Sequence, residues 1–176
     1  MNIPNSITIF RIILIPIIVV LMLTNIPYGG ALAAAIFLFA ALTDSLDGYL
    51  ARRWKQTTKL GAILDPVADK LLITAALISL VELGKLSGWI AIVIIGCEFA
   101  VTGLRVVKAE EGVVIPASKM GKLKTISQVT AVMVIMLEQL IYPLAHWQLG
   151  QWLMYLAVII TLVSGIEYFL KNKITF

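Results

Sequence analysis

Six apolar stretches, each close to the length that crosses a lipid bilayer, dominate this chain. They cover residues 7–24, 29–51, 62–83, 88–108, 125–145 and 150–170. A helix needs about 20 predominantly apolar residues to span the hydrocarbon core. The mean hydropathy of +0.98 and the 60% content of hydrophobic residues exclude an ordinary soluble domain. We therefore predict an all-α integral membrane protein with six transmembrane helices, forming one domain over residues 1–176.

The basic residues are distributed unevenly among the connections between these stretches. The second connection, the fourth connection and the end of the last stretch carry most of them: Arg52, Arg53, Lys55 and Lys59; Lys108, Lys119, Lys122 and Lys124; Lys171 and Lys173. On the opposite side we find Lys85. Cytoplasmic loops of membrane proteins carry an excess of Lys and Arg, so this asymmetry predicts that both termini are cytoplasmic.

Four aspartates lie where the second stretch ends and the third begins. Asp44 and Asp47 are three residues apart, and Asp65 and Asp69 are four residues apart, so each pair shares one face of a helix. Carboxylates at a bilayer boundary are expensive unless they face cations or a polar cavity. We predict a divalent-metal site here, and carboxylate oxygens suit either Mg²⁺ or Mn²⁺.

Small residues accompany the aspartates. Gly48 and Ala51 lie one helical turn apart and leave a surface on which a nucleotide could approach the backbone. Gly61 precedes Asp65 by four residues, and its absent side chain suits close helix packing as well as substrate approach. Arg52 is the one basic residue within the two aspartate segments.

A second polar group precedes the fifth stretch. Three lysines, two hydroxyl residues and a glycine are compressed into residues 118–125, which read Ser-Lys-Met-Gly-Lys-Leu-Lys-Thr. On a helix, Glu98, Thr102 and Arg105 form one polar stripe near the cytoplasmic end of the fourth stretch. Such cations orient membrane proteins in general, but their density here also predicts a phosphate-binding site.

The order of the aspartates and small residues resembles a known signature. Its eight fixed positions, over residues 44–69, are Asp44, Asp47, Gly48, Ala51, Arg52, Gly61, Asp65 and Asp69. They are similar to the signature of the CDP-alcohol phosphotransferases, and residues 4–11 look like the N-terminal segment of that family. The resemblance implies a six-helix membrane enzyme, commonly a homodimer, that transfers a group from a CDP-linked donor to an alcohol and releases CMP.

The resemblance also implies roles for individual residues. Asp44, Asp47, Asp65 and Asp69 would hold two divalent metal ions, and Asp69 would also act as the base. Donor binding would fall to a larger set: Asn5, Thr8, Asp44, Gly48, Ala51, Arg52 and Gly61. Asn5 and Thr8, with Arg11, could equally form a helix start anchored at the cytosolic face.

Residues 98–105 and 121–125 are similar to the branch of the family that uses glycerol 3-phosphate. This implies CDP-diacylglycerol as donor, and an acceptor phosphate bound by Arg105, Ser118, Lys119, Lys122 and Lys124. The branch commonly carries arginine immediately before the glutamate, where this chain has Cys97, so that role is absent or supplied elsewhere. Whether Glu167, near the end of the last stretch, pairs with a lysine or lines the cavity stays open.

Three alternatives concern the activity. An acceptor with two negative charges needs fixed cations, which disfavours serine, whereas inositol phosphate would satisfy the same charges. A divalent-cation transporter would need a polar path across the bilayer, but the outer residues 36–40 and 71–75 are apolar.

We expect membrane lipid as a partner and no nucleic acid, and a multi-pass location in the bacterial cytoplasmic membrane with the active site facing the cytoplasm.

Overall fold

The computed structural model is a bundle of long helices. It describes the backbone of residues 3–24, 26–54, 59–113, 118–138 and 148–171, and the side chains of these residues except 3–6 and 44–65. The helices in these ranges are α1 (Ile3–Leu23), α2 (Gly29–Trp54), α3 (Lys59–Glu82), α4 (Gly88–Glu110), α5 (Lys119–Leu137) and α7 (Leu149–Lys171). The described ranges contain no strand, which confirms the all-helical prediction.

Three of the helices are long and apolar enough to cross a bilayer, namely α4, α5 and α7. Shorter apolar segments occupy Ile7–Leu23 of α1 and Gly29–Thr43 of α2. In α2 and α3 the remaining turns carry the polar residues that the sequence places around the aspartates. The membrane character of the protein is therefore shown, whereas the count of six spans stays a prediction.

The fifth helix begins earlier than the apolar pattern suggests. The predicted stretch starts at residue 125, but α5 begins at Lys119, because Ser118 caps it and the lysines that follow tolerate helical conformation. The Ser118 hydroxyl accepts a hydrogen bond of 2.9 Å from the Gly121 amide. The polar segment that precedes the apolar stretch is thus the first turns of the helix itself.

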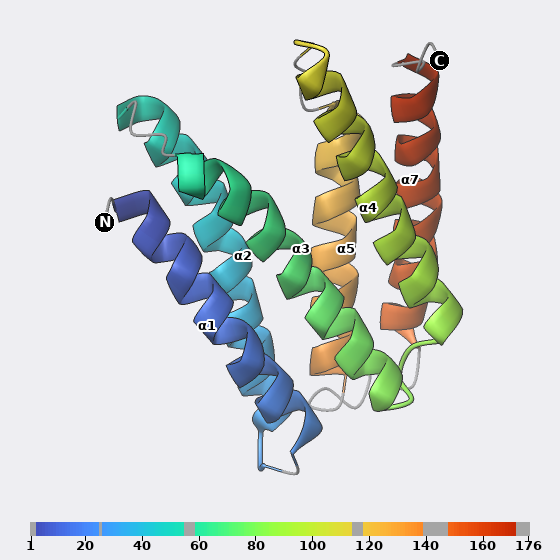
Figure 1. Cartoon of the computed structure of the whole chain (residues 1–176). Coiled ribbons are helices and arrows are strands. Elements are labelled where there is room, and N and C mark those ends of the chain that lie inside the picture. Colours follow the sequence, from blue (N-terminus) through green and yellow to red (C-terminus); the bar gives the residue numbers. More distant parts are fainter. Residues whose placement is uncertain (1–2, 25, 55–58, 114–117, 139–147, 172–176) are drawn as a thin grey trace.

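The helices form two groups that meet along the middle of the bundle. In the first group α1 packs against both α2 and α3, and in the second α7 packs against α5 and α4. Contacts of α2 with α5 and of α3 with α4 join the groups. One end of the bundle collects a terminus of every described helix (Figure 1). These are the first turn of α1, the end of α2, the start of α3, the end of α4, the start of α5 and the last turn of α7. We call this the aspartate end, because the helix turns that carry all four aspartates lie there.

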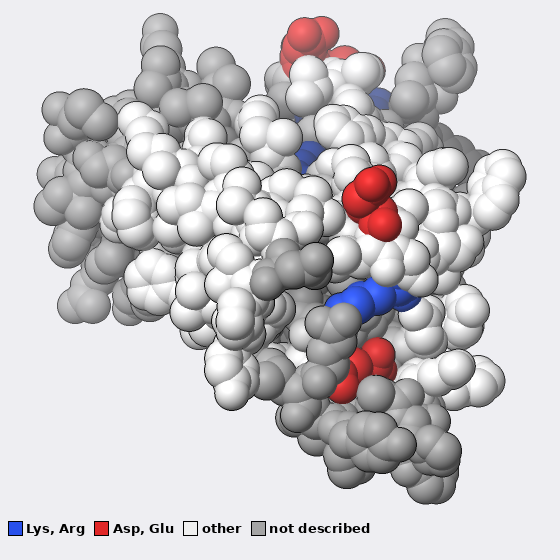
Figure 2. Space-filling view, turned by 90° about the horizontal axis from the view of Figure 1, so that it is seen from below, with Lys and Arg blue, Asp and Glu red and all other residues white. Residues whose placement is uncertain are grey.

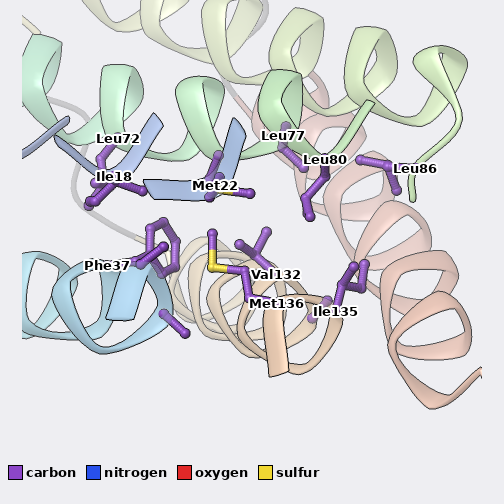
Figure 3. Close-up of a cluster of buried hydrophobic side chains, with 14 of the residues drawn as sticks. Ile18, Met22, Phe37, Leu72, Leu77, Leu80, Leu86, Val132, Ile135 and Met136 are labelled. Carbon is purple, nitrogen blue, oxygen red and sulfur yellow. The ribbon is translucent and has the colours of Figure 1, made fainter. Parts of the chain in front are cut away.

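The core lies between the two groups. Figure 3 shows Ile18 and Met22 of α1 close to Phe37 of α2, with Val132 and Met136 of α5 beside them. All of these side chains are buried, and they form one cluster with the inner face of α3. Large apolar side chains on the outer faces of the helices, by contrast, are exposed, as a surface covered by lipid requires.

The end opposite the aspartates carries few charges among its described residues. Seen from that end, Figure 2 shows a basic patch between two acidic ones on a largely uncharged surface, with further charged atoms towards the upper edge of the view. Lys85 and Glu138 lie close enough to interact electrostatically, and the Glu138 carboxylate accepts a 2.6 Å hydrogen bond from the Gly150 amide at the start of α7. Burial lowers the pKa of Lys85, and the Glu138 carboxylate partly opposes this shift. Lys85 and Glu138 thus belong to the contacts between the helix ends on this side, where Glu138 links the end of α5 to the start of α7.

Candidate active site

The aspartates lie on the two helices that the sequence predicts. Asp44 and Asp47 are in the last turns of α2, and Asp65 and Asp69 are in the first turns of α3. The two helices are in contact. The helical spacing of both pairs is thus confirmed, while the side chains of Asp44, Asp47 and Asp65 lie outside the described residues.

Asp69 is half-buried and borders two cavities. One cavity, of about 200 Å³, is enclosed by α3, α4, α5 and α7 and is lined by charged and hydroxyl side chains. We call it the polar cavity. The other, of about 210 Å³, lies between α2, α3, α4 and α5 and is lined mainly by apolar side chains such as Phe37, Leu42 and Ile73. We call it the apolar cavity.

The predicted polar stripe of α4 faces the polar cavity. Glu98, Thr102 and Arg105 all line it, together with Asp69 of α3. The Thr102 hydroxyl donates a 2.7 Å hydrogen bond to the Glu98 carbonyl within the helix. The stripe is therefore confirmed as one surface of the candidate site.

Arg105 is held by a tyrosine from the last helix. Its Nη2 donates a hydrogen bond to the hydroxyl of Tyr168, and the centre of the guanidinium lies 5.0 Å from the centroid of the Tyr168 ring. The same hydroxyl accepts a 3.2 Å hydrogen bond from the backbone amide of Ser118. Tyr168 thereby connects α4, the cap of α5 and α7.

The basic segment at the start of α5 divides between two environments. Lys122 and Lys124 line the polar cavity, whereas the exposed Lys119 does not belong to the described lining. Lys124 is buried and forms a 2.9 Å ion pair with Glu98. Ser118 contributes its cap and its contact with Tyr168 rather than a cavity wall.

The residues predicted for donor binding lie at the aspartate end. Asn5 is in the first turns of α1, Gly48, Ala51 and Arg52 are in the last turns of α2, and Gly61 is near the start of α3. Their side-chain positions lie outside the described residues. Thr8 and Arg11 are fully buried, with 0% and 1% of their surfaces exposed.

The structure bears on two questions that the sequence leaves open, namely the roles of Glu167 and Cys97. Glu167 pairs with Lys171, one helical turn further along α7, which decides between the alternatives that the sequence leaves open. Cys97 is half-buried, and its thiol donates a weak 3.4 Å hydrogen bond to the Thr161 carbonyl, so it supplies no cation at this position. The described cations of the polar cavity are instead Lys70, Arg105, Lys122 and Lys124.

Tyr168 and Lys70 are the site residues that the sequence does not reveal. Tyr168 lies 63 residues from Arg105 along the chain, in a helix whose pattern is otherwise that of a membrane span. Lys70 directly follows Asp69, and its position after an aspartate of the signature was the signal that could have identified it.

The carboxylates can accommodate metal ions by their chemistry and helical register. Oxygen ligands from several carboxylates are what Mg²⁺ and Mn²⁺ prefer. The two pairs lie on contacting helices at one end of the bundle. Among the side chains that the structure describes, no group of three His, Cys, Asp or Glu residues forms a second candidate metal centre.

The sequence as a whole is similar to proteins of one family. Residues 1–163 match the family model of CDP-alcohol phosphatidyltransferase. A protein of Bacillus subtilis strain 168, named CDP-diacylglycerol--glycerol-3-phosphate 3-phosphatidyltransferase, is 44% identical over 97% of this chain and 95% of its own length. Proteins of the same name from Haemophilus influenzae and Rickettsia typhi are 40% and 34% identical, over 95% and 99% of this chain and 91% and 99% of their own lengths.

Proposed function

Because this chain belongs to the CDP-alcohol phosphatidyltransferase family, we propose that it transfers the phosphatidyl group of CDP-diacylglycerol to glycerol 3-phosphate. The products are phosphatidylglycerol phosphate and CMP. The transporter alternative loses its basis, because the matched family consists of phosphatidyltransferases. One catalytic domain over residues 1–176 agrees with a match that covers residues 1–163.

The observation that carries the proposal is the polar cavity. Asp69, the last aspartate of the signature, lines it together with Arg105 and Lys122. A carboxylate on one wall and cations on another suit an acceptor that has a hydroxyl to be deprotonated and a phosphate to be bound. Glycerol 3-phosphate carries both groups within one small molecule.

Asp44, Asp47, Asp65 and Asp69 would hold two divalent metal ions. Bound there, the ions would neutralise the pyrophosphate oxygens of the donor and the charge that develops on the leaving CMP. Gly48 and Ala51, close to the first pair of aspartates, would let the nucleotide approach α2.

Asp69 has the role of general base in this proposal. The primary hydroxyl of glycerol 3-phosphate attacks the phosphorus that carries diacylglycerol, its proton passes to Asp69, and the bond between this phosphorus and the bridging oxygen breaks. The electron pair leaves with CMP. Such a base must lie within hydrogen-bond reach of the hydroxyl, and the cavity that Asp69 shares with Arg105 and Lys122 supports this assignment.

The acceptor phosphate brings between one and two negative charges at neutral pH. Arg105 and Lys122, with Lys70 beside Asp69, can supply the balancing charge, since Lys124 is already paired with Glu98. Ser118, the cap of α5, and Lys119, in its first turn, are outside the described cavity lining and stay proposed as further phosphate contacts. Inositol phosphate satisfies the same charges and is the alternative acceptor.

The donor carries two long acyl chains that must remain in an apolar environment. The apolar cavity also reaches Asp69, so the donor headgroup would arrive at this carboxylate from the side of α2 and α5. Asn5, Arg52 and Gly61 are the further residues proposed to contact it, whereas the full burial of Thr8 leaves this residue no exposed surface for such a contact.

The proposed location is the bacterial cytoplasmic membrane, with six spans and with both termini and the active site facing the cytoplasm. The uneven distribution of Lys and Arg supports this orientation. A homodimer follows from the family resemblance. Labelling of Gly30→Cys and Lys171→Cys, each combined with Cys97→Ala, by an impermeant reagent before and after permeabilisation of the cells would test the orientation. Cross-linking in native membranes would test the dimer.

The deciding experiment is CMP release by the purified full-length protein. CDP-diacylglycerol is supplied with Mg²⁺ or Mn²⁺ and with glycerol 3-phosphate, inositol phosphate or serine. We expect release with glycerol 3-phosphate, its loss on addition of a chelator, and its return with excess metal. Release with inositol phosphate alone would change the acceptor, and chelator-resistant release would reject the metal-dependent mechanism.

A further inference from the structure

We propose that Tyr168 is a positioning residue that fixes Arg105 and the start of α5 around the acceptor phosphate. The inference rests on the proposed function, because it assigns the role through the same polar cavity. Tyr168 belongs to α7, a helix that contributes no residue to the predicted site. It is 4% exposed and lines the cavity with Asp69 and Arg105.

The hydroxyl of Tyr168 is the point at which three elements meet. It accepts hydrogen bonds from the Arg105 guanidinium of α4 and from the backbone amide of Ser118, which caps α5. A Cβ atom placed on Gly121 would lie 3.8 Å from the Tyr168 ring, so the first turn of α5 packs directly on this side chain. The oxygen and the ring together fix α5 relative to α4.

The contacts with Arg105 restrain a side chain that is otherwise free to move. Arg105 is exposed as a whole, and an unrestrained arginine loses considerable rotamer entropy when it binds a ligand. The ring lies 5.0 Å from the guanidinium and the hydroxyl occupies one of its donors, while an arginine has five N–H groups in all. The remaining donors can therefore meet a phosphate from a preorganised position.

The hydroxyl also restrains the segment that supplies Lys122. The backbone amide of Ser118 donates a hydrogen bond to the Tyr168 hydroxyl, and the Ser118 hydroxyl accepts one from the Gly121 amide. Lys122 follows in the same helical turn and lines the cavity. Loss of one oxygen atom would thus loosen two phosphate-binding groups at once.

The test is the substitution Tyr168→Phe in the purified full-length protein, which retains the ring and removes the hydroxyl. The KM for glycerol 3-phosphate should rise about tenfold, as expected for loss of one charge-assisted hydrogen bond. The kcat and the KM for CDP-diacylglycerol should stay close to the parent values, and the protein should remain folded at the assay temperature although the lost hydrogen bonds lower its melting temperature somewhat. An unchanged KM for the acceptor, or a lower kcat accompanied by a lower melting temperature, would overturn the proposal.

A matched control and a double variant separate positioning from general packing. Tyr155→Phe changes an exposed tyrosine at the other end of the same helix and should leave all constants unchanged. In an Arg105→Ala background, Tyr168→Phe should raise the KM by clearly less than it does alone, because one of its two targets is already gone. Fully additive effects would show that Tyr168 does not act through Arg105.

Binding of inorganic phosphate, followed by thermal unfolding, provides a readout that does not depend on turnover. Phosphate should stabilise the parent protein and should stabilise Tyr168→Phe only at about tenfold higher concentration. Absence of CMP release with glycerol 3-phosphate would reject the proposed function without affecting this result. Equal stabilisation of both proteins, or of neither, would reject the role of Tyr168.

Discussion

Lys124 of α5 and Glu98 of α4 form a 2.9 Å ion pair on the wall of the polar cavity, with 5% and 20% of their side chains exposed. The pair joins two of the helices whose polar residues border the candidate site. Because Glu98 compensates the charge of Lys124, a bound phosphate would meet net positive charge at Lys70, Arg105 and Lys122. Within the lysine cluster at the start of α5, Lys124 is thus the structural member, and Lys122 is the member proposed to bind the ligand.

Removing one partner of this pair should destabilise the protein. Glu98→Gln leaves the buried ammonium of Lys124 without its counter-charge, and such changes cost about 3 kcal/mol. Thermal unfolding in detergent should show a clear decrease in melting temperature, and the double variant Glu98→Gln/Lys124→Met should recover part of it. Glu111→Gln, which breaks the more exposed pair with Lys108, should cost less than about 1 kcal/mol. Equal losses for both single variants would contradict this account.

Substitution of Asp69 should abolish chemistry without unfolding the protein. Asp69→Asn retains the size of the side chain and removes both the proton acceptor and a metal-binding charge, so kcat should fall at least about a thousandfold. Glu82→Gln changes a carboxylate at the other end of α3 and serves as the control. Melting temperatures near that of the parent protein, together with CMP release by the control alone, are the expected result. Substantial turnover by Asp69→Asn would remove this residue from the mechanism.

Changes of the cavity cations should affect acceptor affinity more than the maximal rate. Arg105→Ala and Lys122→Ala should each raise the KM for glycerol 3-phosphate about tenfold, because both groups bind the phosphate in the ground state and in the transition state. Lys108→Ala, a cation one turn beyond Arg105 that pairs with Glu111, is the control. Initial rates over a range of acceptor concentrations measure the effect. A loss confined to kcat would place the phosphate elsewhere.

The close contact between α5 and α7 should make Gly150 intolerant of any side chain. A Cβ atom there would lie 2.5 Å from Cγ1 of Ile135 and 2.8 Å from the Glu138 carboxylate. Gly150→Ala should therefore destabilise the protein by about 2 kcal/mol. Gly96→Ala, at a helical glycine with no neighbouring atom within 4 Å, should be neutral or stabilising by up to about 1 kcal/mol. Thermal unfolding of the two variants compares them directly, and similar melting temperatures would refute the packing argument.

Local patterns predicted the helices and the polar stripe because the relevant information lies within a few residues. Apolar stretches of sufficient length give the helical segments, and a spacing of three or four residues gives a common face, as Glu98, Thr102 and Arg105 confirm. The start of α5 at Lys119, ahead of the predicted span, was not predicted, since hydropathy does not register the cap that Ser118 provides.

Contacts between distant helices could not be predicted in this way. The pairing of Lys124 with Glu98 and of Arg105 with Tyr168 depends on how α4, α5 and α7 pack. From the sequence, the lysines of the basic segment were equivalent candidates for phosphate binding, and Tyr168 was one aromatic residue of an apolar helix. The roles of Asp44, Asp47 and Asp65 remain predictions, because their side chains lie outside the described residues.

Asp69 borders the apolar cavity on one side and the polar cavity on the other. The two cavities share Asp69, Lys70, Glu98 and Thr125, so a lipid-soluble reactant in the apolar cavity and a water-soluble one in the polar cavity would meet at the same carboxylate. We expect the two substrates to bind in random order, with the lipid product returning to the bilayer while CMP departs into water.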